Sequence, residues 1–436
     1  MNHLSRYFVM CTALSAIGGC TSIQTQPNET WLLSAQTDEY GTLESLVEFS
    51  TDRRGQMQGA SEFFTVVLPQ GGDATAQVTV NFIDGGSTQV DGVQSDDGAL
   101  IFDVTHERWG GEWSLSQTNI SDWRRDYNIV QEAVQTTMQQ WLYDPRLLNE
   151  TQYLEFKTDF ARRSVEANDD FEFMDSFDDT WDGELFSHFE VLRPLNTMEG
   201  LLEEADEASE EKPVAHFELL EPEIALVTFD SFFGTAIEQQ IDDAMIAAID
   251  SGATSLIIDV RENPGGTTAA VPVGSRIIQE QAVFGYFLAN KWWRDHTTLP
   301  SLSELEARPT LNGRTPPQLM GELMQTGVVA ASVYPAEKTF DGDVYILISE
   351  RSGSATEAVV GMLKMSGRVT LVGETTAGRM LSSNFFPLPD DFSVRIPVAD
   401  FFLMDGSRID GAGVSPDVEV ADEDALAKAL ELIRSK

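Results

Sequence analysis

The sequence predicts an α/β core at its C-terminal end, preceded by a helical segment and an N-terminal antiparallel β domain. Short alternating runs such as "FFTVVL" and "ALIFDV" occupy the first part of the 436 residues, as in half-buried strands. A helical period replaces them from about residue 119. From Pro213 on, continuous apolar runs such as "LIIDV" and "VYILI" alternate with helical patterns, which is typical of a mostly parallel sheet covered by helices.

The β domain is expected over residues 21–118. Its apolar runs are separated by the turn sequences "DRRG", "PQGGD" and "DDG", at the spacing of a small sandwich or barrel. The aromatic residues in these runs fit core positions, and no pattern in this part of the chain indicates chemistry.

Residues 119–212 are expected to form the helical segment. The run "YNIVQEAVQTTMQQWLY" places four residues near one helix face, Ile129, Ala133, Met138 and Trp141. The acidic stretch from Glu203 to Lys212 is interpreted as a linker to the core, which spans residues 213–436. Within the core, residues 287–335 are predicted to be irregular and are a candidate lining for a substrate groove.

The charge excludes several classes of partner. The chain has 71 acidic and 28 basic residues, a net charge of −43, which would repel nucleic acid and anionic lipid headgroups. Because the acidic residues are spread along the whole chain, they indicate adaptation to solubility or salt rather than a binding patch.

The N-terminus resembles an export signal. Residues 1–20 combine Arg6, an apolar stretch and small residues, and the stretch is too short to span a membrane. The ending "AIGGC" resembles a bacterial lipoprotein signal, which implies lipidation of Cys20. Thr21 after the cysteine implies the outer membrane of the cell envelope, facing the periplasm. The alternative is an ordinary cleaved signal.

Cys11 and Cys20 are the two cysteines of the chain, so the residues after the signal are expected to contain neither a disulfide nor a cysteine metal site.

Two stretches of the core are candidates for chemistry. In "IIDVRENPGG", residues 257–266, a buried strand leads into a Pro-Gly-Gly turn whose backbone amides could hold an oxyanion. In "SERSGSATEAVVG", residues 349–361, Ser354 stands where a helix begins and is a candidate nucleophile. The alternatives are a turn without a ligand and a capping box of Ser354 with Glu357.

A nucleophilic serine also needs a base. Beyond the signal, four histidines are available, namely His106, His188, His216 and His296.

Three motifs together resemble a known family. "LIIDVRENPGG", "SGSATEAVVGMLKMSGRVTLVGETTAG" and "GAGVSPDVEV" occur in this order in the C-terminal processing peptidases and their tricorn-like relatives, the S41 serine peptidases. The resemblance covers about residues 120–430 and implies a crotonase-like α/β core. It also implies that Ser354 is the nucleophile and that the amides of Gly266 and Ala355 form the oxyanion hole.

The resemblance also distinguishes two catalytic branches. The processing-peptidase branch uses a lysine where this chain has Arg379, and arginine stays protonated and cannot act as a base. The tricorn-like branch implies Ser187 and His188 as a Ser-His pair, with a carboxylate at Asp410. The family usually has glutamate at this last position, so the shorter aspartate is a departure. The segment of about residues 199–214 is too short for the PDZ domain that the lysine branch usually carries.

These residues predict an exported serine peptidase that acts on peptide or protein substrates and needs no cofactor or metal. It would meet the membrane only through a lipid anchor at Cys20. The alternative is a catalytically inactive, S41-like lipoprotein that binds a peptide or an apolar ligand. Acyl-CoA chemistry of the crotonase kind is a third hypothesis, but the sequence offers no basic site for the CoA phosphates.

Overall fold

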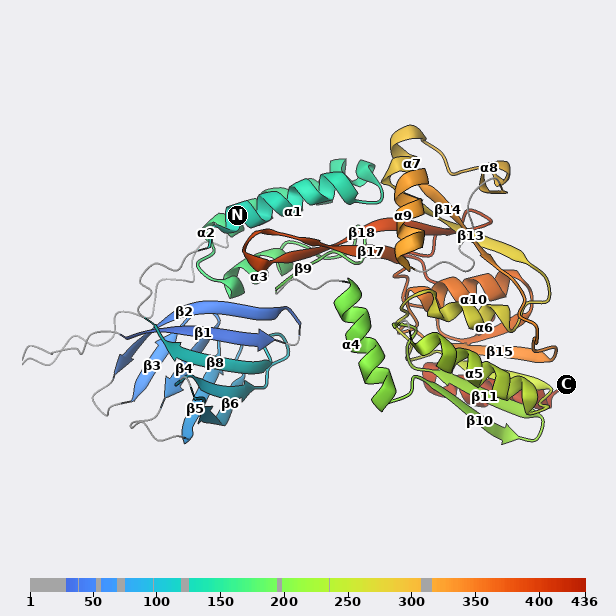
Figure 1. Cartoon of the computed structure of the whole chain (residues 1–436), viewed down its shortest axis with the longest axis horizontal. Coiled ribbons are helices and arrows are strands. Elements are labelled where there is room, and N and C mark those ends of the chain that lie inside the picture. The colour runs from blue at the N-terminus through green and yellow to red at the C-terminus, as the bar shows by residue number, and fades with distance from the viewer. Residues whose placement is uncertain are drawn as a thin grey trace, which may run out of the picture. The chain divides into compact units, whose positions relative to one another are not determined.

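The computed structural model describes residues 29–37, 39–51, 56–68, 75–96, 98–118, 125–193, 198–234, 236–306 and 316–436. The chain divides into two compact units (Figure 1). The first takes in the chain up to Ser34 and Ser45–Asp122, and the second takes in Ala35–Glu44 and Trp123–Lys436.

The predicted signal and Cys20 lie outside the described residues. None of the helices in the described ranges has the length and apolar character needed to cross a membrane.

A closed barrel of consecutive strands makes up most of the first unit. Their bounds are β1 Glu29–Thr37, β2 Gly41–Thr51, β3 Met57–Ala60, β4 Phe64–Leu68, β5 Thr75–Phe82, β6 Ser87–Gln94, β7 Leu100–Val104 and β8 Gly111–Gln117. Only the end of β1 and the start of β2 belong to Ala35–Glu44 of the second unit. Side chains alternate between the core and the surface, as in β4, and Trp113 packs in the core against Phe64 with ring centroids 4.9 Å apart. This confirms the predicted antiparallel β domain and selects the barrel over the sandwich.

The second unit begins with helices. They are α1 Tyr127–Trp141, the short 3-10 helix η1 Pro145–Asn149, α2 Thr151–Glu166 and α3 Asp170–Asp178. The face predicted for α1 is right for Met138, which is buried, and wrong for Ile129, which is exposed, while Ala133 and Trp141 are half-buried. The buried residues Val130, Val134 and Met138 follow one another at a spacing of four residues. A run of apolar residues on several sides of the helix left the sequence pattern ambiguous.

The acidic stretch that was interpreted as a linker is a helix, α4 Met198–Glu211. Glutamate and alanine favour helices, and Leu202 and Ser209 give the helix a buried side. The helix is fastened to the core, because the Asp206 carboxylate accepts a hydrogen bond from the Ala236 N–H at 2.9 Å and Gln240 donates to the Ser209 carbonyl at 3.3 Å.

A six-stranded sheet forms the centre of the predicted α/β core. Its order is β10-β11-β12-β15-β16-β19, and every neighbouring pair after the antiparallel β10-β11 pair is parallel. The bounds are β10 Ala215–Glu221, β11 Ile224–Phe229, β12 Ser255–Asp259, β15 Asp343–Ile348, β16 Val369–Gly373 and β19 Val418–Glu419.

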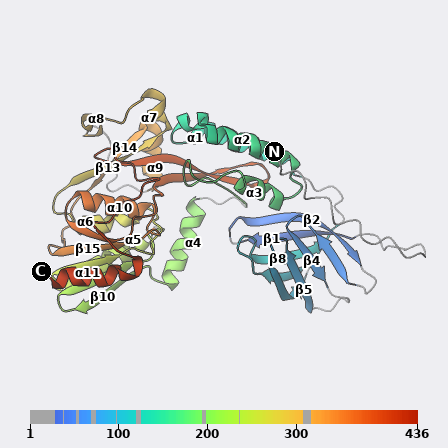
Figure 2. The same ribbon diagram turned by 180° about the vertical axis from the view of Figure 1, so that it is seen from behind.

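Helices cover both faces of this sheet. Residues of α5 Ile237–Asp250, α6 Val271–Ser275 and α10 Ala355–Met365 share one apolar cluster with one face. On the opposite face lies α11 Ala425–Arg434, the red helix in the reverse view (Figure 2). It packs on Ile257, Tyr345 and Leu347. Because both faces are covered, the central strands are apolar without alternation, which is the pattern that predicted them. Two short 3-10 helices lie in the connections between these strands and helices, η2 Thr268–Ala270 and η4 Asp422–Asp424.

A second, antiparallel sheet was not predicted. Its order is β14-β13-β18-β17, and β9 pairs with the long strand β18. The bounds are β9 Glu190–Leu192, β13 Ala282–Ala289, β14 Val328–Val333, β17 Leu381–Pro387 and β18 Ser393–Leu403, with the turn η3 Pro389–Asp391 between the last two strands.

The segment 287–335, predicted to be irregular, is largely regular where it is described. It contains the end of β13, the helices α7 Asn290–Asp295, α8 Leu302–Glu306 and α9 Pro316–Thr326, and β14. Trp292 is buried in a small cluster with Leu305 and Val328, and its ring N–H donates to the Thr298 carbonyl at 2.9 Å. This tryptophan is therefore a packing residue.

Candidate active site

The candidate site begins where β12 and β15 end. The two strands are parallel neighbours, so their carboxyl ends bring residues 260–266 and 349–354 to the same edge of the sheet. Asn263 links the two loops from a fully buried position. Its Oδ1 accepts from the Gly265 N–H and from the Thr356 hydroxyl, both at 2.9 Å, while its amide donates to the Phe229 carbonyl at 3.1 Å.

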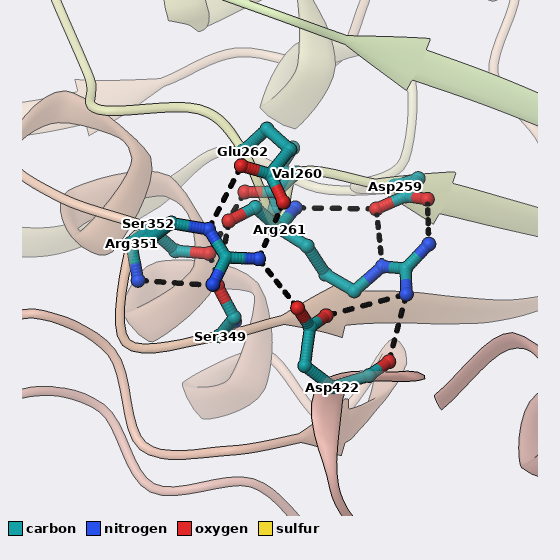
Figure 3. Close-up of polar contacts among 8 residues, drawn as sticks. All are labelled: Asp259, Val260, Arg261, Glu262, Ser349, Arg351, Ser352 and Asp422. Atoms are coloured by element: carbon teal, nitrogen blue, oxygen red, sulfur yellow. Dashed lines mark hydrogen bonds and ion pairs between the residues drawn. The ribbon is translucent and has the colours of Figure 1, made fainter. Parts of the chain in front are cut away.

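A polar network behind these loops connects them further. Figure 3 shows Arg261 and Arg351 converging on Asp422. Arg261 forms a two-pronged pair with Asp259, with contacts of 2.9 and 2.7 Å, and donates to the Asp422 carbonyl at 2.7 Å. The Ser349 hydroxyl donates to the Arg261 carbonyl at 2.6 Å. The loop after β12 is thus held to the loop after β15 directly, through Ser349, and indirectly, through the Asp422 that both arginines contact.

Ser354 occupies a strained position at the start of α10. Its φ of 52° and ψ of −119° are rare for a residue with a side chain. Gly265 packs directly against it, because a Cβ on this glycine would lie 2.6 Å from the Ser354 Cβ. The close approach explains why the turn needs glycine at this point.

Of the two residues predicted to form an oxyanion hole, Ala355 follows Ser354 in the chain and Gly266 follows Gly265, which packs against Ser354. Gly266 has a φ of 149°, and a Cβ there would lie 2.0 Å from the Phe232 backbone, so only glycine fits. Neither the Gly266 nor the Ala355 N–H donates to another group among the described residues. Two unused donors next to a serine hydroxyl can hold a developing negative charge.

Glu357 holds the backbone of the serine. This fully buried carboxylate accepts four hydrogen bonds, from the N–H groups of Ser354, Gly378 and Arg379 at 2.9, 2.7 and 2.8 Å and from the Thr376 hydroxyl at 2.6 Å. Burial raises its pKa, and the four donors oppose that shift. The predicted capping contact of Glu357 is therefore present, and it also ties residues 376–379 to Ser354. The sequence showed the cap but not this second role.

The predicted Ser-His pair is held by aromatic neighbours. His188 has a φ of 61°, a second strained position. The residues on either side of the pair, Phe186 and Phe189, are buried in a cluster with Trp181, at centroid distances of 4.6 and 5.0 Å from its ring. The cluster fixes the backbone on both sides of the pair.

The structure brings Ser187, His188 and Asp410 into one hydrogen-bonded chain. The Ser187 hydroxyl lies 2.7 Å from His188 Nδ1 and donates to Asp410 Oδ1 at 2.9 Å. The shorter aspartate therefore reaches Ser187. Since the hydroxyl proton is directed at Asp410, Ser187 accepts from an Nδ1–H, which leaves His188 Nε2 unprotonated.

Asp410 has further partners that the sequence analysis missed. Its Oδ1 also accepts from the Met380 N–H at 3.1 Å, and its Oδ2 accepts from Arg408 at 2.9 Å. Arg408 bonds Asp400 at 2.6 Å and the Tyr143 hydroxyl at 2.8 Å. Burial raises the pKa of Asp410, and the Arg408 charge acts against that shift. Arg408 precedes Asp410 by two residues, and this short spacing of opposite charges is the sequence feature that could have indicated their contact.

Residues 378–380 connect the two halves of the site. Gly378 and Arg379 bond the carboxylate that holds Ser354, and Met380 bonds the carboxylate that holds Ser187. His188 and Ser354 themselves share no hydrogen bond in the described chain. Burial, followed by the charges of Arg395 and Arg379, lowers the pKa of His188 to about 3, so its imidazole is neutral.

The other histidines have structural contacts instead. His106 stacks on Phe82 in the barrel, His216 lies 3.4 Å from the Asp230 carboxylate, and His296 stacks on the Trp292 ring. Within the described ranges, no group of three or more histidine, cysteine, aspartate or glutamate side chains could hold a metal ion.

Residues 223–420 match the family model described as "Peptidase family S41". This part of the chain belongs to peptidase family S41. Carboxyl-terminal-processing proteases of a Picosynechococcus and a Synechocystis species are 24% identical to it over 179 and 199 residues. These matches cover 41% and 46% of this chain and 34% and 38% of the relatives, so the chain spans little more than a third of their length. The solved structure of a photosystem II D1 C-terminal processing protease is 14% identical, covers 69% of this chain and 94% of its own, and has a TM-score of 0.43.

The S41 segment contains Ser354, Gly266, Ala355 and Asp410, whereas Ser187 and His188 precede it. Ser187 and His188 therefore lie outside the segment that matches the family model. The fold of the chain brings Ser187 into contact with Asp410.

Proposed function

We propose that the protein is an exported serine peptidase with a crotonase-like core, in which Ser354 is the nucleophile and His188 is the base. The observation that carries this proposal is the hydrogen-bonded chain of Asp410, Ser187 and His188, assembled from distant parts of the sequence. The backbone of Arg379 and Met380 links this chain to Glu357, which holds the strained Ser354 at the start of a helix. Backbone strain of this kind concentrates at functional sites.

The proposed reaction uses each group in one role. His188 Nε2 takes the Ser354 proton as the hydroxyl oxygen attacks the peptide carbonyl, and later gives it to the leaving amine. Ser187 orients the imidazole through Nδ1, and the Asp410 charge stabilises the imidazolium through Ser187. The Gly266 and Ala355 amides hold the negative charge of the tetrahedral intermediate.

A serine-lysine mechanism fits this chain less well. This mechanism is considered because relatives of the chain are named as processing proteases. In this chain, however, Arg379 occupies the position of the family lysine. A guanidinium does not release its proton at any ordinary pH, so it cannot serve as the base.

A fluorophosphonate probe tests the proposal, because it reacts with activated serines. Wild-type protein should be labelled at Ser354, and Ser354→Ala and His188→Ala should abolish labelling and peptide hydrolysis. Ser435→Ala, on an exposed serine at the end of α11, is the matched control and should react like the wild type. A folded wild-type protein that stays unlabelled would support the alternative, an inactive binding lipoprotein.

Export and lipidation form a separate part of the proposal. It is supported by the signal-like residues 1–20 and by Cys20 at their end. If Cys20 carries lipid, native protein should partition into the detergent phase and fractionate with the outer membrane. Cys20→Ser should release it or leave an unprocessed precursor. Wild-type protein found wholly in the aqueous phase after export would contradict the anchor.

A further inference from the structure

Arg379 differs from the other arginines near the candidate site because its side chain has no acidic partner. Most arginines of the described chain pair with a carboxylate, and Arg261, Arg351 and Arg395 do so close to the site. The Arg379 side chain is exposed, and no hydrogen bond or ion pair engages its guanidinium within the part of the chain that the structure describes. In a chain of net charge −43, a cation without an acidic partner is unusual.

The backbone of Arg379 is fixed between the two halves of the site. Its N–H donates to Glu357 Oε2 at 2.8 Å, the same oxygen that accepts from the Ser354 N–H at 2.9 Å. The next residue, Met380, donates to Asp410 Oδ1, which also accepts from Ser187. The Arg379 side chain therefore starts from a point between the nucleophile and the residues that hold the base.

Arg395 is the second cation whose charge acts on His188, but two of its nitrogens already have partners. Its Nε donates to the Ser383 hydroxyl at 2.7 Å, and Nη1 lies 3.3 Å from both carboxylate oxygens of Glu190. The charges of both arginines act on His188 and contribute to its lowered pKa. Two arginine charges therefore act on the imidazole in an otherwise acidic protein, and the guanidinium of Arg379 is the one without a hydrogen-bond or ion-pair partner among the described residues.

We infer that Arg379 binds a carboxylate of the peptide substrate next to the scissile bond. A guanidinium offers two parallel N–H donors, which match the two oxygens of a carboxylate. The carboxylate could be the C-terminal one of the substrate or that of an Asp or Glu side chain. This inference rests on the proposed peptidase function and adds a substrate class to it.

Matched peptides test the inference on the purified full chain, with cleavage sites mapped by mass spectrometry. One pair differs only in a free C-terminal carboxylate or its amide. A second pair has both ends capped and differs only in Glu or Gln beside the cleaved bond. Wild-type kcat/KM should be about tenfold or more higher for the charged member of at least one pair, as expected for a hydrogen bond between charged groups. The pair that responds identifies the source of the carboxylate.

Arg379→Gln should bring this ratio close to one, whereas Arg162→Gln, on an exposed arginine of α2, should leave it unchanged. Equal rates for both members of each pair in the wild type, or a preference that survives in Arg379→Gln, would overturn the inference. Fluorophosphonate labelling of wild-type Ser354 separates the two proposals. A labelled enzyme without carboxylate preference overturns only the inference, and an unlabelled enzyme that cleaves no peptide overturns the peptidase function and the inference with it.

Discussion

His188 and Ser354 are two of four non-glycine residues with positive φ in the described chain. The other two, Asp390 and Asp391, lie in the turn between β17 and β18, where aspartate tolerates this conformation. Each strained residue costs of order 1–3 kcal/mol, so its surroundings must hold it in place. Burial of Phe186 and Phe189 holds His188, and Glu357 holds Ser354. The resemblance to a family pointed to both residues, but no sequence pattern predicts this strain.

Asp410→Asn tests the role of the charge at the end of the hydrogen-bonded chain. Asparagine keeps the size of the side chain but cannot stabilise an imidazolium through Ser187. We expect kcat to fall by about ten- to a hundredfold with a smaller change in KM, because the lost interaction forms mainly in the transition state. The loss should be smaller than that of Ser354→Ala. Steady-state kinetics with one peptide substrate measure both parameters.

The control for this variant is Asp159→Asn, which removes one exposed carboxylate from α2. It should leave kcat unchanged. A wild-type kcat in Asp410→Asn would mean that Asp410 only binds Met380 and Arg408 and has no part in catalysis. The proposed catalytic residues would then be Ser354 and His188 alone.

The pH dependence of kcat/KM tests His188 as the base. An ordinary histidine would be protonated below pH 6.5, but burial and the charges of Arg395 and Arg379 lower the pKa of His188 to about 3. Because the neutral imidazole is the active form, kcat/KM should stay level as pH falls through 6.5 and should decline only below about pH 5. Asp410, whose pKa burial raises, faces the imidazole through Ser187, so its protonation can add to that decline.

Arg395→Gln removes one of the two cations and should raise the pKa of His188. The decline in kcat/KM should then begin at a higher pH than in the wild type. A wild-type profile that already falls near pH 6.5, or an identical profile in Arg395→Gln, would contradict this electrostatic account.

At the scale of elements, prediction succeeded where one face or both faces of an element are buried in a regular pattern. The central strands β12 and β15 were predicted because their apolar runs are continuous, and the start of α10 was predicted from the serine- and glycine-rich stretch that follows β15. The antiparallel sheet was missed because β14 and most of β18 are buried on both faces and pair over long sequence separations. Pairing of β9 with β18 places the strand that follows His188, and no local pattern indicates it.

The Arg261 network tests how the strand-end loops are held together. Arg261→Gln removes the two-pronged pair with Asp259 and the contacts to Asp422. Charge-assisted hydrogen bonds of partly buried groups contribute about 1.5–3 kcal/mol, so we expect the free energy of unfolding to fall by roughly that amount. Labelling of Ser354 by a fluorophosphonate should also slow, because the Gly266 amide loses its fixed distance from the serine.

Arg162→Gln is the comparison for stability, because its pairs with Asp159 and Glu166 are exposed. Such pairs contribute about 0–1 kcal/mol, and this variant should unfold almost like the wild type. If Arg261→Gln is as stable and as reactive as Arg162→Gln, the network does not position the site. Urea unfolding and the labelling rate give the two readouts.

At the scale of the whole molecule, the 71 acidic and 28 basic residues leave 43 negative charges in excess. Ion pairs such as those of Arg434 with Glu221 and Lys338 with Asp250 are exposed, so each contributes little. Salt weakens these attractions and the general repulsion together. Because unpaired acidic residues are in large excess, the repulsion is the larger effect, and screening should stabilise the folded state.

We therefore expect the melting temperature at pH 7 to rise by a few degrees as NaCl increases from about 0.02 M to 0.5 M. The Debye length falls below about 10 Å above 0.1 M, so most of the rise should come at the lower concentrations. Scanning calorimetry is suited to the measurement, because the two compact units can melt separately. The same titration near pH 4 is the control, since protonation of many carboxylates removes the repulsion and should abolish the effect. A melting temperature that does not change with salt at pH 7 would mean that repulsion between the acidic residues does not destabilise the folded state. The acidic composition would then reflect solubility alone.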